Sequence, residues 1–157
     1  MAELNYTITI NAPKEKVWHV MLDPESYKAW TSVFQPGSYY EGSLDKGSEI
    51  KFVAEDDNGL SGLYGRIAEN IQYEYLSIEY LGEIVNGQVD TTGDEARTWI
   101  GAHENYNFTE VDGKTTVDVS LIGEKVGDEM AMMFDGMWPK ALHTLKELCE
   151  ADSKKSV

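Results

Sequence analysis

A stripe of apolar side chains near the C-terminus constrains the fold of this chain more than any other feature. Between residues 125 and 150, apolar residues recur at the spacing of one helix face, and they include Met137, Trp138, Leu142 and Leu145. A stripe this broad predicts one long helix whose apolar face must be buried against another layer of structure. The remainder of the chain must supply that layer.

The residues before this helix predict an antiparallel sheet. Residues 4–11 alternate between apolar and polar side chains, the period of a half-buried strand. From Gly37 to Gly123 the same period is interrupted by turn sequences such as Asp56-Asp57-Asn58-Gly59. The predicted strands cover residues 4–11, 38–42, 48–55, 61–70, 73–81, 97–110 and 115–123. The segment from Gly82 to Ala96 has little apolar content and is expected to be a long loop.

Two short helices are predicted directly after the first strand, because Pro13 and Pro24 each suit the first turn of a helix. The expected fold is therefore α+β, with a curved antiparallel sheet of six or seven strands, two short helices after the first strand, and the long C-terminal helix packed across the sheet. We expect a single domain over residues 1–150 and a flexible tail over residues 151–157.

The turn at Asp112-Gly113 fixes the register of the last hairpin, since both residues tolerate a positive φ. This register places Phe108 opposite Val117, Tyr106 opposite Val119, and Glu104 opposite Leu121. Alternation then puts Ile100 on the same inner face as Tyr106. It also puts Trp99 on the convex face, beside the long loop.

Glu104 is the most informative polar residue, because the register predicts an inward carboxyl among apolar neighbours. Burial would raise its pKa, so that it can serve as an acid, a base or a hydrogen-bond anchor. If Arg66 or Arg97 pairs with it, the role of Glu104 is structural.

Composition excludes several classes of partner. The chain has 13 basic and 28 acidic residues and a formal charge of −15, which disfavours nucleic acid and anionic lipid surfaces. No segment approaches the roughly 18 apolar residues of a membrane span, so no membrane insertion is expected. The N-terminus lacks the pattern of a secretory signal, and the single Cys149 excludes an internal disulfide. A cytoplasmic location is expected.

Metal ligands and nucleophile motifs are not apparent in the sequence. His19, His103 and His143 do not occur at the spacing that gathers a metal ion. No serine or cysteine lies in a glycine-framed elbow. We therefore expect neither a metal nor a cofactor.

The order of elements resembles the SRPBCC or START-like superfamily, the helix-grip fold of the birch-pollen allergen, over nearly the whole chain. Ala12-Pro13-x-x-x-Val17-Trp18-x-x-x-x-Asp23-Pro24 followed by Tyr27-x-x-Trp30 is similar to the tandem-helix pattern of the branch that includes the activator of the ninety-kilodalton heat-shock chaperone's ATPase. Trp138-x-x-x-Leu142-x-x-Leu145 is similar to the helix ending of that branch. The resemblance implies a cavity between sheet and long helix, which in the superfamily holds lipids, sterols, hormones or polyketides. A few members catalyse cyclisation, dehydration or hydrolysis there.

We expect such a cavity to be lined from the facing strands and the first half of the long helix. The predicted lining residues are Phe52, Ile78, Tyr80, Glu104, Tyr106, Met130, Met133, Phe134 and Met137. Methionines repack around varied guests, although core packing explains them equally well. Gly136 and Pro139 predict a kink or break in the helix, which is either a gate or a bend that follows the twisted sheet.

Three functions follow, in order of preference. The first is binding of a small hydrophobic or amphipathic molecule in the cavity. The alternative is a co-chaperone-like module that binds a protein partner. The third is an enzyme of the cyclase, dehydratase or hydrolase type with Glu104 and either Tyr106 or Tyr80 as acid–base groups. We favour a non-enzymatic role, because the sequence predicts only one inward carboxylate.

Overall fold

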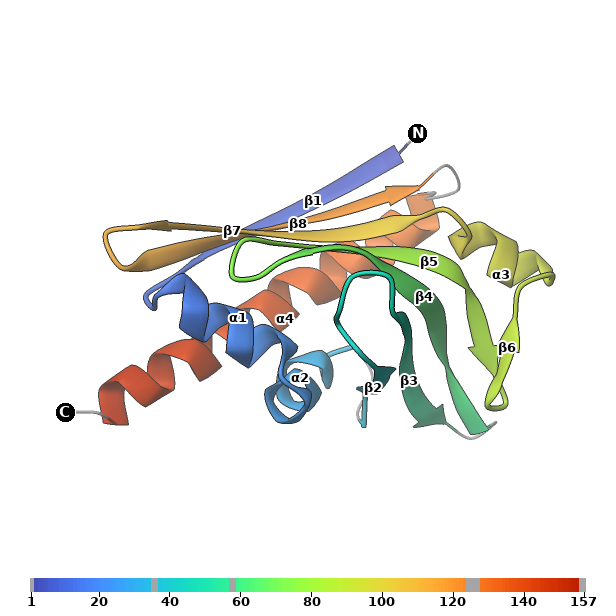
Figure 1. The fold of residues 1–157 in the computed structure, drawn as a ribbon, viewed down its shortest axis with the longest axis horizontal. Helices are drawn as coiled ribbons and strands as arrows, with labels where there is room; N and C mark the ends of the chain where they lie inside the picture. Colours follow the sequence, from blue (N-terminus) through green and yellow to red (C-terminus); the bar gives the residue numbers. More distant parts are fainter. Residues whose placement is uncertain (1, 35–36, 57–58, 124–127, 156–157) are drawn as a thin grey trace.

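The computed structural model describes residues 2–34, 37–56, 59–123 and 128–155 (Figure 1). Its elements in chain order are β1 (Ala2–Ile10), α1 (Lys14–Leu22), α2 (Pro24–Thr31), β2 (Tyr39–Gly42), β3 (Glu49–Asp56), β4 (Gly59–Ile71), β5 (Tyr75–Val85), β6 (Gln88–Asp90), α3 (Asp94–Trp99), β7 (His103–Val111), β8 (Lys114–Gly123) and α4 (Asp128–Lys155). The predicted α+β fold is confirmed.

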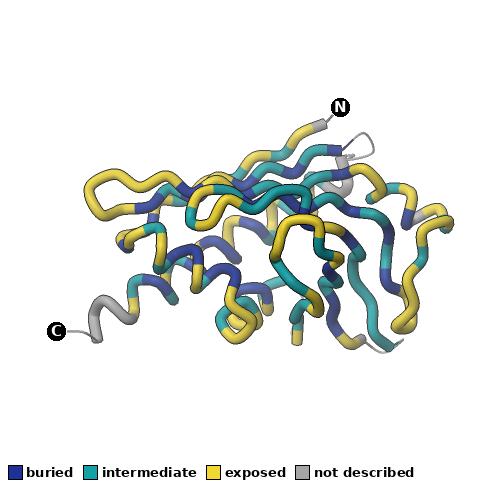
Figure 2. Tube along the Cα trace, in the orientation of Figure 1, coloured by how far each residue is buried: buried dark blue, intermediate teal, exposed yellow. Residues whose placement is uncertain are grey.

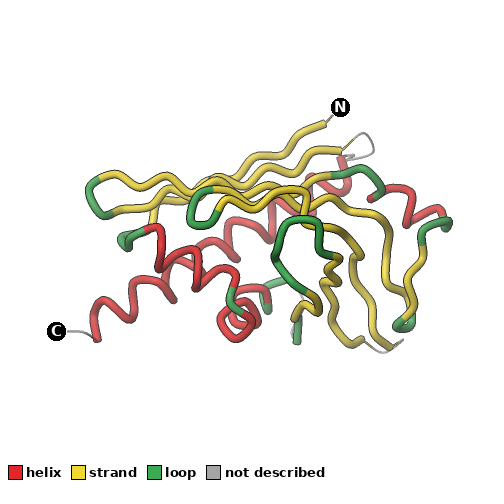
Figure 3. Tube along the Cα trace, viewed as in Figure 1, coloured by secondary structure: helices red, strands yellow, loops and turns green. Residues whose placement is uncertain are grey.

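The strands form one antiparallel sheet in the order β1-β8-β7-β5-β4-β3-β2, and the short β6 pairs with β5. The sheet bends strongly, so that α4, α1 and α2 lie together within its curve (Figures 1 and 3). Two register shifts between β4 and β5, one of them at Tyr64/Gly65, contribute to this curvature. A Cβ on Gly65 would lie 2.7 Å from the carbonyl oxygen of Glu79, so the strands can approach this closely only because the residue is glycine.

The predicted register of the last hairpin is confirmed, with Glu104 opposite Leu121 and Phe108 opposite Val117. The turn residues Asp112 and Gly113 both have positive φ, of 54° and 79°. This left-handed backbone matches the twist of the flanking strands. The turn therefore determines which side chains of β7 face α4.

The predicted loop over residues 82–96 is wrong. This segment contains the end of β5, the short strand β6 and the start of α3. The Asp90 carboxylate accepts hydrogen bonds from the backbone N–H groups of Thr92 and Gly93, both at 3.0 Å, and so turns the chain from β6 into α3. The acidic Asp94 at the start of α3 and Arg97 in its last turn match the helix dipole. This charge pattern was the sequence signal from which the helix could have been predicted.

The presence of α3 also places Trp99 and Ile100 differently from the strand prediction. Residues 97–102 do not belong to a strand, so alternation does not apply to them. Trp99 is half-buried and packs on the inner side of the sheet, and not on its convex face as predicted. Ile100 is 45% exposed, and not on the inner face with Glu104.

The helix α4 continues through Pro139 without the predicted break. Its second half is anchored in the core, where Ala141, Leu142, Leu145 and Cys149 are buried (Figure 2). Its first half is more open, since Met132 is 76% exposed. Within the described residues, no helix is long and apolar enough to cross a membrane.

Candidate functional site

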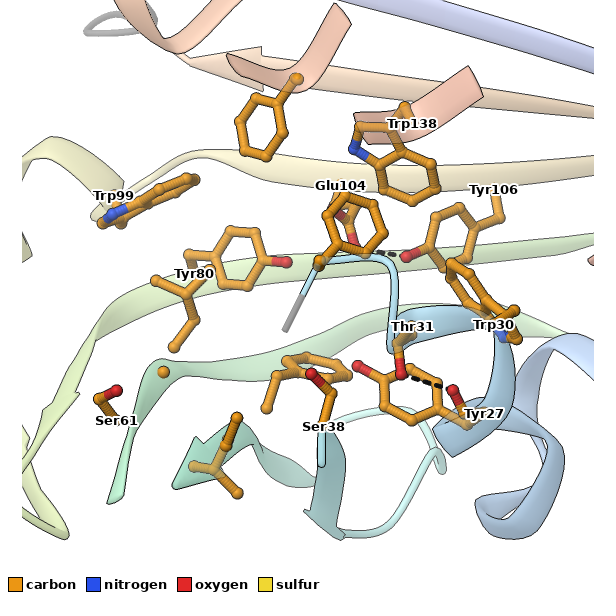
Figure 4. Close-up of a pocket in the computed structure, with 17 residues that line it drawn as sticks. Tyr27, Trp30, Thr31, Ser38, Ser61, Tyr80, Trp99, Glu104, Tyr106 and Trp138 are labelled. Atoms are coloured by element: carbon orange, nitrogen blue, oxygen red, sulfur yellow. Dashed lines mark hydrogen bonds between the residues drawn. The ribbon is translucent and has the colours of Figure 1, made fainter. Parts of the chain in front are cut away.

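A pocket of about 320 Å³ lies where the bent sheet meets the helices (Figure 4). It is bordered by α2, by strands β3, β4, β5 and β7, by α3 and by the first half of α4. The bordering residues are Tyr27, Trp30, Thr31, Phe34, Ser38, Phe52, Val53, Ala54, Ser61, Gly62, Leu63, Tyr80, Trp99, Glu104, Tyr106, Phe134 and Trp138. Aromatic side chains predominate among them.

These aromatic rings contact one another in a nearly continuous series around the pocket. On one side, Trp99 packs edge-on against Tyr80 and Phe134, with centroids 5.7 and 6.2 Å apart. On the other side, Trp30 and Trp138 lie 5.9 Å apart. Such mutually packed rings have few alternative rotamers, so the walls are largely pre-formed.

Glu104 lies in one wall, and of the residues described around the pocket it alone carries a carboxyl group. Its position in β7 is opposite Ile78 of β5, which makes Tyr80 its diagonal neighbour on the same face. Tyr106, two residues further along β7, donates its hydroxyl to Glu104 Oε2. Tyr80 also hydrogen-bonds Glu104 through its side chain. The sheet thus brings one carboxyl and two phenols to a single apolar wall.

Burial dominates the electrostatics of this group. It raises the pKa of Glu104 above the ordinary value, while the hydrogen bonds from Tyr106 and Tyr80 lower it in part. Burial also raises the pKa of Tyr80 and of Tyr106 well above the ordinary range, and the nearby Glu104 charge adds to this effect. Both phenols therefore remain protonated hydrogen-bond donors at physiological pH. A carboxyl and phenols in such surroundings can anchor a polar group of a ligand or exchange a proton with it.

Two indole groups differ in their hydrogen bonding. Trp30 Nε1 donates to the carbonyl oxygen of Met21 at 2.8 Å. Trp138 is only 3% exposed, and its Nε1–H has no acceptor among the described residues. Its ring packs 6.2 Å from that of Tyr106, the residue that donates to Glu104. Figure 4 shows Trp138 on the α4 side of the pocket and Glu104 on the facing strand.

Several of the predicted lining residues border the pocket. They are Phe52, Tyr80, Glu104, Tyr106 and Phe134. The others do not border it: Ile78 is fully buried in the core on the same face of the sheet as Glu104, Met133 is 46% exposed at the surface, and Met137 is half-buried outside the pocket. The side chain of Met130 lies outside the described residues.

Sequence reasoning missed the contribution of α2 and α3. Tyr27, Trp30 and Thr31 project from α2, and Trp99 closes the opposite end from α3. The Tyr27-x-x-Trp30 spacing signalled one shared helix face, but it did not show whether that face met a cavity or the core. Trp99 was missed because residues 97–99, the end of α3, were predicted to be part of a strand with Trp99 on its convex face.

The proposed structural role of Glu104 through Arg66 is wrong. Arg66 Nη2 instead lies 2.6 Å from Glu79 Oε1, and these two residues are opposite one another in the β4–β5 ladder. Among the described residues, no three His, Cys, Asp or Glu side chains converge as a set of metal ligands.

Comparison with known proteins places this architecture in a family. Residues 11–150 match the family described as Activator of Hsp90 ATPase homolog 1-like protein. Among curated proteins, no sequence matches the chain.

Solved structures share the fold at low sequence identity. A protein from Nitrosomonas europaea matches with a TM-score of 0.72 and 16% identity over 97% of this chain and 96% of its own. A protein from Cytophaga hutchinsonii matches with a TM-score of 0.72 and 18% identity over 98% and 97%. The Aha1 dimer from Colwellia psychrerythraea matches with a TM-score of 0.67 and 21% identity over 96% and 97%. With the family match covering most of its length, the chain belongs to the Activator of Hsp90 ATPase homolog 1-like family, a branch of the helix-grip superfamily.

Proposed function

We propose that this protein binds a small, predominantly apolar molecule in the pocket between the sheet and α4. The observation that carries the proposal is the composition of the walls: aromatic side chains predominate, and the one carboxyl group among the described bordering residues is that of Glu104, which Tyr80 and Tyr106 hydrogen-bond. Small-molecule sites are typically apolar concavities of about 300–1,000 Å³ with a few placed polar groups. The pocket lies at the small end of that range, so a ligand of two or three fused rings suits it better than a long lipid.

Leaving the pocket without a ligand is energetically unfavourable, and a bound ligand would relieve this cost. Aromatic walls around empty or water-filled space lose dispersion contacts that a bound apolar molecule would restore. A core built only for stability would fill this space with side chains, as the neighbouring cluster around Leu142 and Leu145 does. An occupied pocket is therefore the natural state of this wall composition.

A neutral, environment-sensitive naphthalene dye such as prodan tests the proposal. We expect its emission to shift to the blue on addition of the protein. Ala54→Phe should abolish the shift, because Ala54 borders the pocket and the added ring would fill it. The matched control is Ala29→Phe, at an exposed position of α2 outside the pocket, which should leave the shift intact. No shift with the wild type, or an equal shift with Ala54→Phe, would reject binding in this pocket.

A second candidate is a co-chaperone-like interaction with a protein partner, and family membership favours it. The description of the family names activation of the Hsp90 ATPase, and one similar structure is an Aha1 dimer. The exposed side chains of Met132 and Met133 supply apolar surface on α4 for such a contact. The test is the ATPase rate of an Hsp90-type chaperone with and without this protein. A raised rate that falls back with Met132→Asp supports this candidate, and an unchanged rate dismisses it.

A further inference from the structure

The indole N–H of Trp138 points to the chemistry of the ligand. A buried donor without an acceptor is costly, and within the described part of the chain Trp138 Nε1 is the buried side-chain polar atom that lacks one. It borders the pocket, so a bound molecule can supply the missing acceptor. A purely apolar ligand would leave this donor unsatisfied in an even drier environment.

The facing wall offers the complementary group. A carboxylate has about four acceptor positions, and the described donors to Glu104 are the hydroxyls of Tyr106 and Tyr80. Acceptor capacity therefore remains on Glu104 for a donor on the ligand. Tyr106 contacts both groups, since it hydrogen-bonds Glu104 and its ring packs against Trp138.

One functional group meets both requirements. A hydroxyl oxygen accepts a hydrogen bond and its proton is donated in turn, whereas an ether or ketone only accepts and an ammonium group only donates. A ligand carboxylate would face the carboxyl of Glu104 in a protein of formal charge −15. Resting on the proposed binding function, we propose that the ligand is an uncharged aromatic molecule with a hydroxyl group, which accepts from Trp138 Nε1–H and donates to Glu104.

Four naphthalene probes of similar size separate these possibilities by calorimetric titration at neutral pH. They are 2-naphthol, 2-methoxynaphthalene, 2-methylnaphthalene and 2-naphthoate. We expect 2-naphthol to bind at least roughly tenfold more tightly than the methyl and methoxy probes, because it alone can both accept from Trp138 Nε1–H and donate to Glu104. 2-Naphthoate should bind weakest.

Two tryptophan variants provide the matched test. Trp138→Phe keeps an aromatic wall but removes the N–H, so the preference for 2-naphthol over 2-methylnaphthalene should fall to about threefold or less. Trp30→Phe removes an indole that also borders the pocket but already donates to Met21, so that preference should persist. If Trp138→Phe does not fold, the wild-type indole signals decide. 2-Naphthol should shift the Trp138 indole proton downfield relative to 2-methylnaphthalene, and the Trp30 proton should respond alike to both probes.

The outcomes separate this inference from the function beneath it. Equal affinity for the hydroxyl, methoxy and methyl probes, or tightest binding of 2-naphthoate, overturns the hydroxyl assignment while binding in the pocket stands. A preference that survives Trp138→Phe, or an unmoved Trp138 indole proton, overturns it as well. If neither prodan nor any of the four probes binds, the proposed binding function falls together with the inference.

Discussion

Glu104 shows how a residue's neighbours set its chemistry. Apolar surroundings destabilise its ionised form, and two phenol hydroxyls partly restore it. Its inward direction was predictable, because the Asp112-Gly113 turn fixes the register of its strand. Tyr80 was also named beside Glu104 as a possible acid–base group, but the β5–β7 register that makes the two residues neighbours was not predictable, since that pairing crosses a segment expected to be loop.

The raised pKa of Glu104 makes a pH-dependent prediction. Above the ordinary value of 4.5, the unfolded chain releases a proton that folded Glu104 retains up to its raised pKa. The free energy of unfolding therefore falls as pH rises through this window. Glu104→Gln cannot titrate, so its stability relative to the wild type should increase from acid toward neutral pH. Urea unfolding midpoints of both proteins at a series of pH values measure this.

The control for that experiment is Glu25→Gln, at a side chain that is 92% exposed. Its urea midpoints should follow those of the wild type across the pH series. A stability difference between Glu104→Gln and the wild type that stays constant with pH, or shrinks as pH rises, would show that Glu104 ionises normally in the fold.

Among the elements, α4 combines an anchor with a more open segment. Residues 141–149 place several side chains in the core, whereas residues 131–137 leave Met132 and Met133 exposed. The first half contacts β1 through a hydrogen bond of 2.7 Å, which the Tyr6 hydroxyl donates to Asp135 Oδ1. The apolar stripe of α4 was predictable from periodicity. Its unbroken path through Pro139 was not, because a local pattern does not show that Trp138 and Ala141, on either side of the proline, are buried against the core.

Hydrogen exchange tests whether the first half of α4 opens by itself. We expect the amides of residues 131–138 to exchange faster than those of residues 141–149, because they have fewer buried contacts and Pro139 removes one helical hydrogen bond. Exchange followed by mass spectrometry resolves the two halves. Equal rates would mean that α4 opens as one unit and would rule out a gate at Pro139.

Substitution of alanine for glycine should have opposite effects on stability at two positions. Gly113 has a φ of +79°, where an added Cβ is strained, so Gly113→Ala should lower the free energy of unfolding by about 1–2 kcal/mol. Gly136 lies in α4, and apart from its chain neighbours and the helix's own backbone nothing lies within 4 Å of an added Cβ, so Gly136→Ala should raise the free energy of unfolding by up to about 1 kcal/mol. Chemical denaturation of both variants measures these changes. Stabilisation by Gly113→Ala would contradict the turn geometry.

At the scale of the whole molecule, the net charge and the fold depend on different features of the sequence. The formal charge of −15 produces repulsion within the folded protein, while the fold depends on the apolar periods that made the strand–helix order readable from sequence. The architecture followed from those local patterns. The pocket could not be predicted in this way. It depends on Trp99, Trp30 and Trp138, which three separate helices bring together, and the periodicity of each helix gives no information about contacts between helices.

Screening of this repulsion predicts a salt effect on stability. The melting temperature should rise by a few degrees with NaCl and level off near about 0.5 M, where the Debye length has fallen to about 4 Å. Differential scanning calorimetry across a salt series measures it. A melting temperature that falls, or that keeps rising linearly toward molar salt, would indicate that charge repulsion is not the cause.

The four tryptophans of the chain allow the most direct test of binding in the pocket. Trp30, Trp99 and Trp138 border it, whereas Trp18 is buried elsewhere against Phe108 and Tyr73. In proton–nitrogen correlation spectra recorded during a prodan titration, we predict saturable shifts of the indole signals of Trp30, Trp99 and Trp138 and a stationary signal of Trp18. Shifts confined to Trp18, or no saturable shift of the three pocket indoles, would contradict the account.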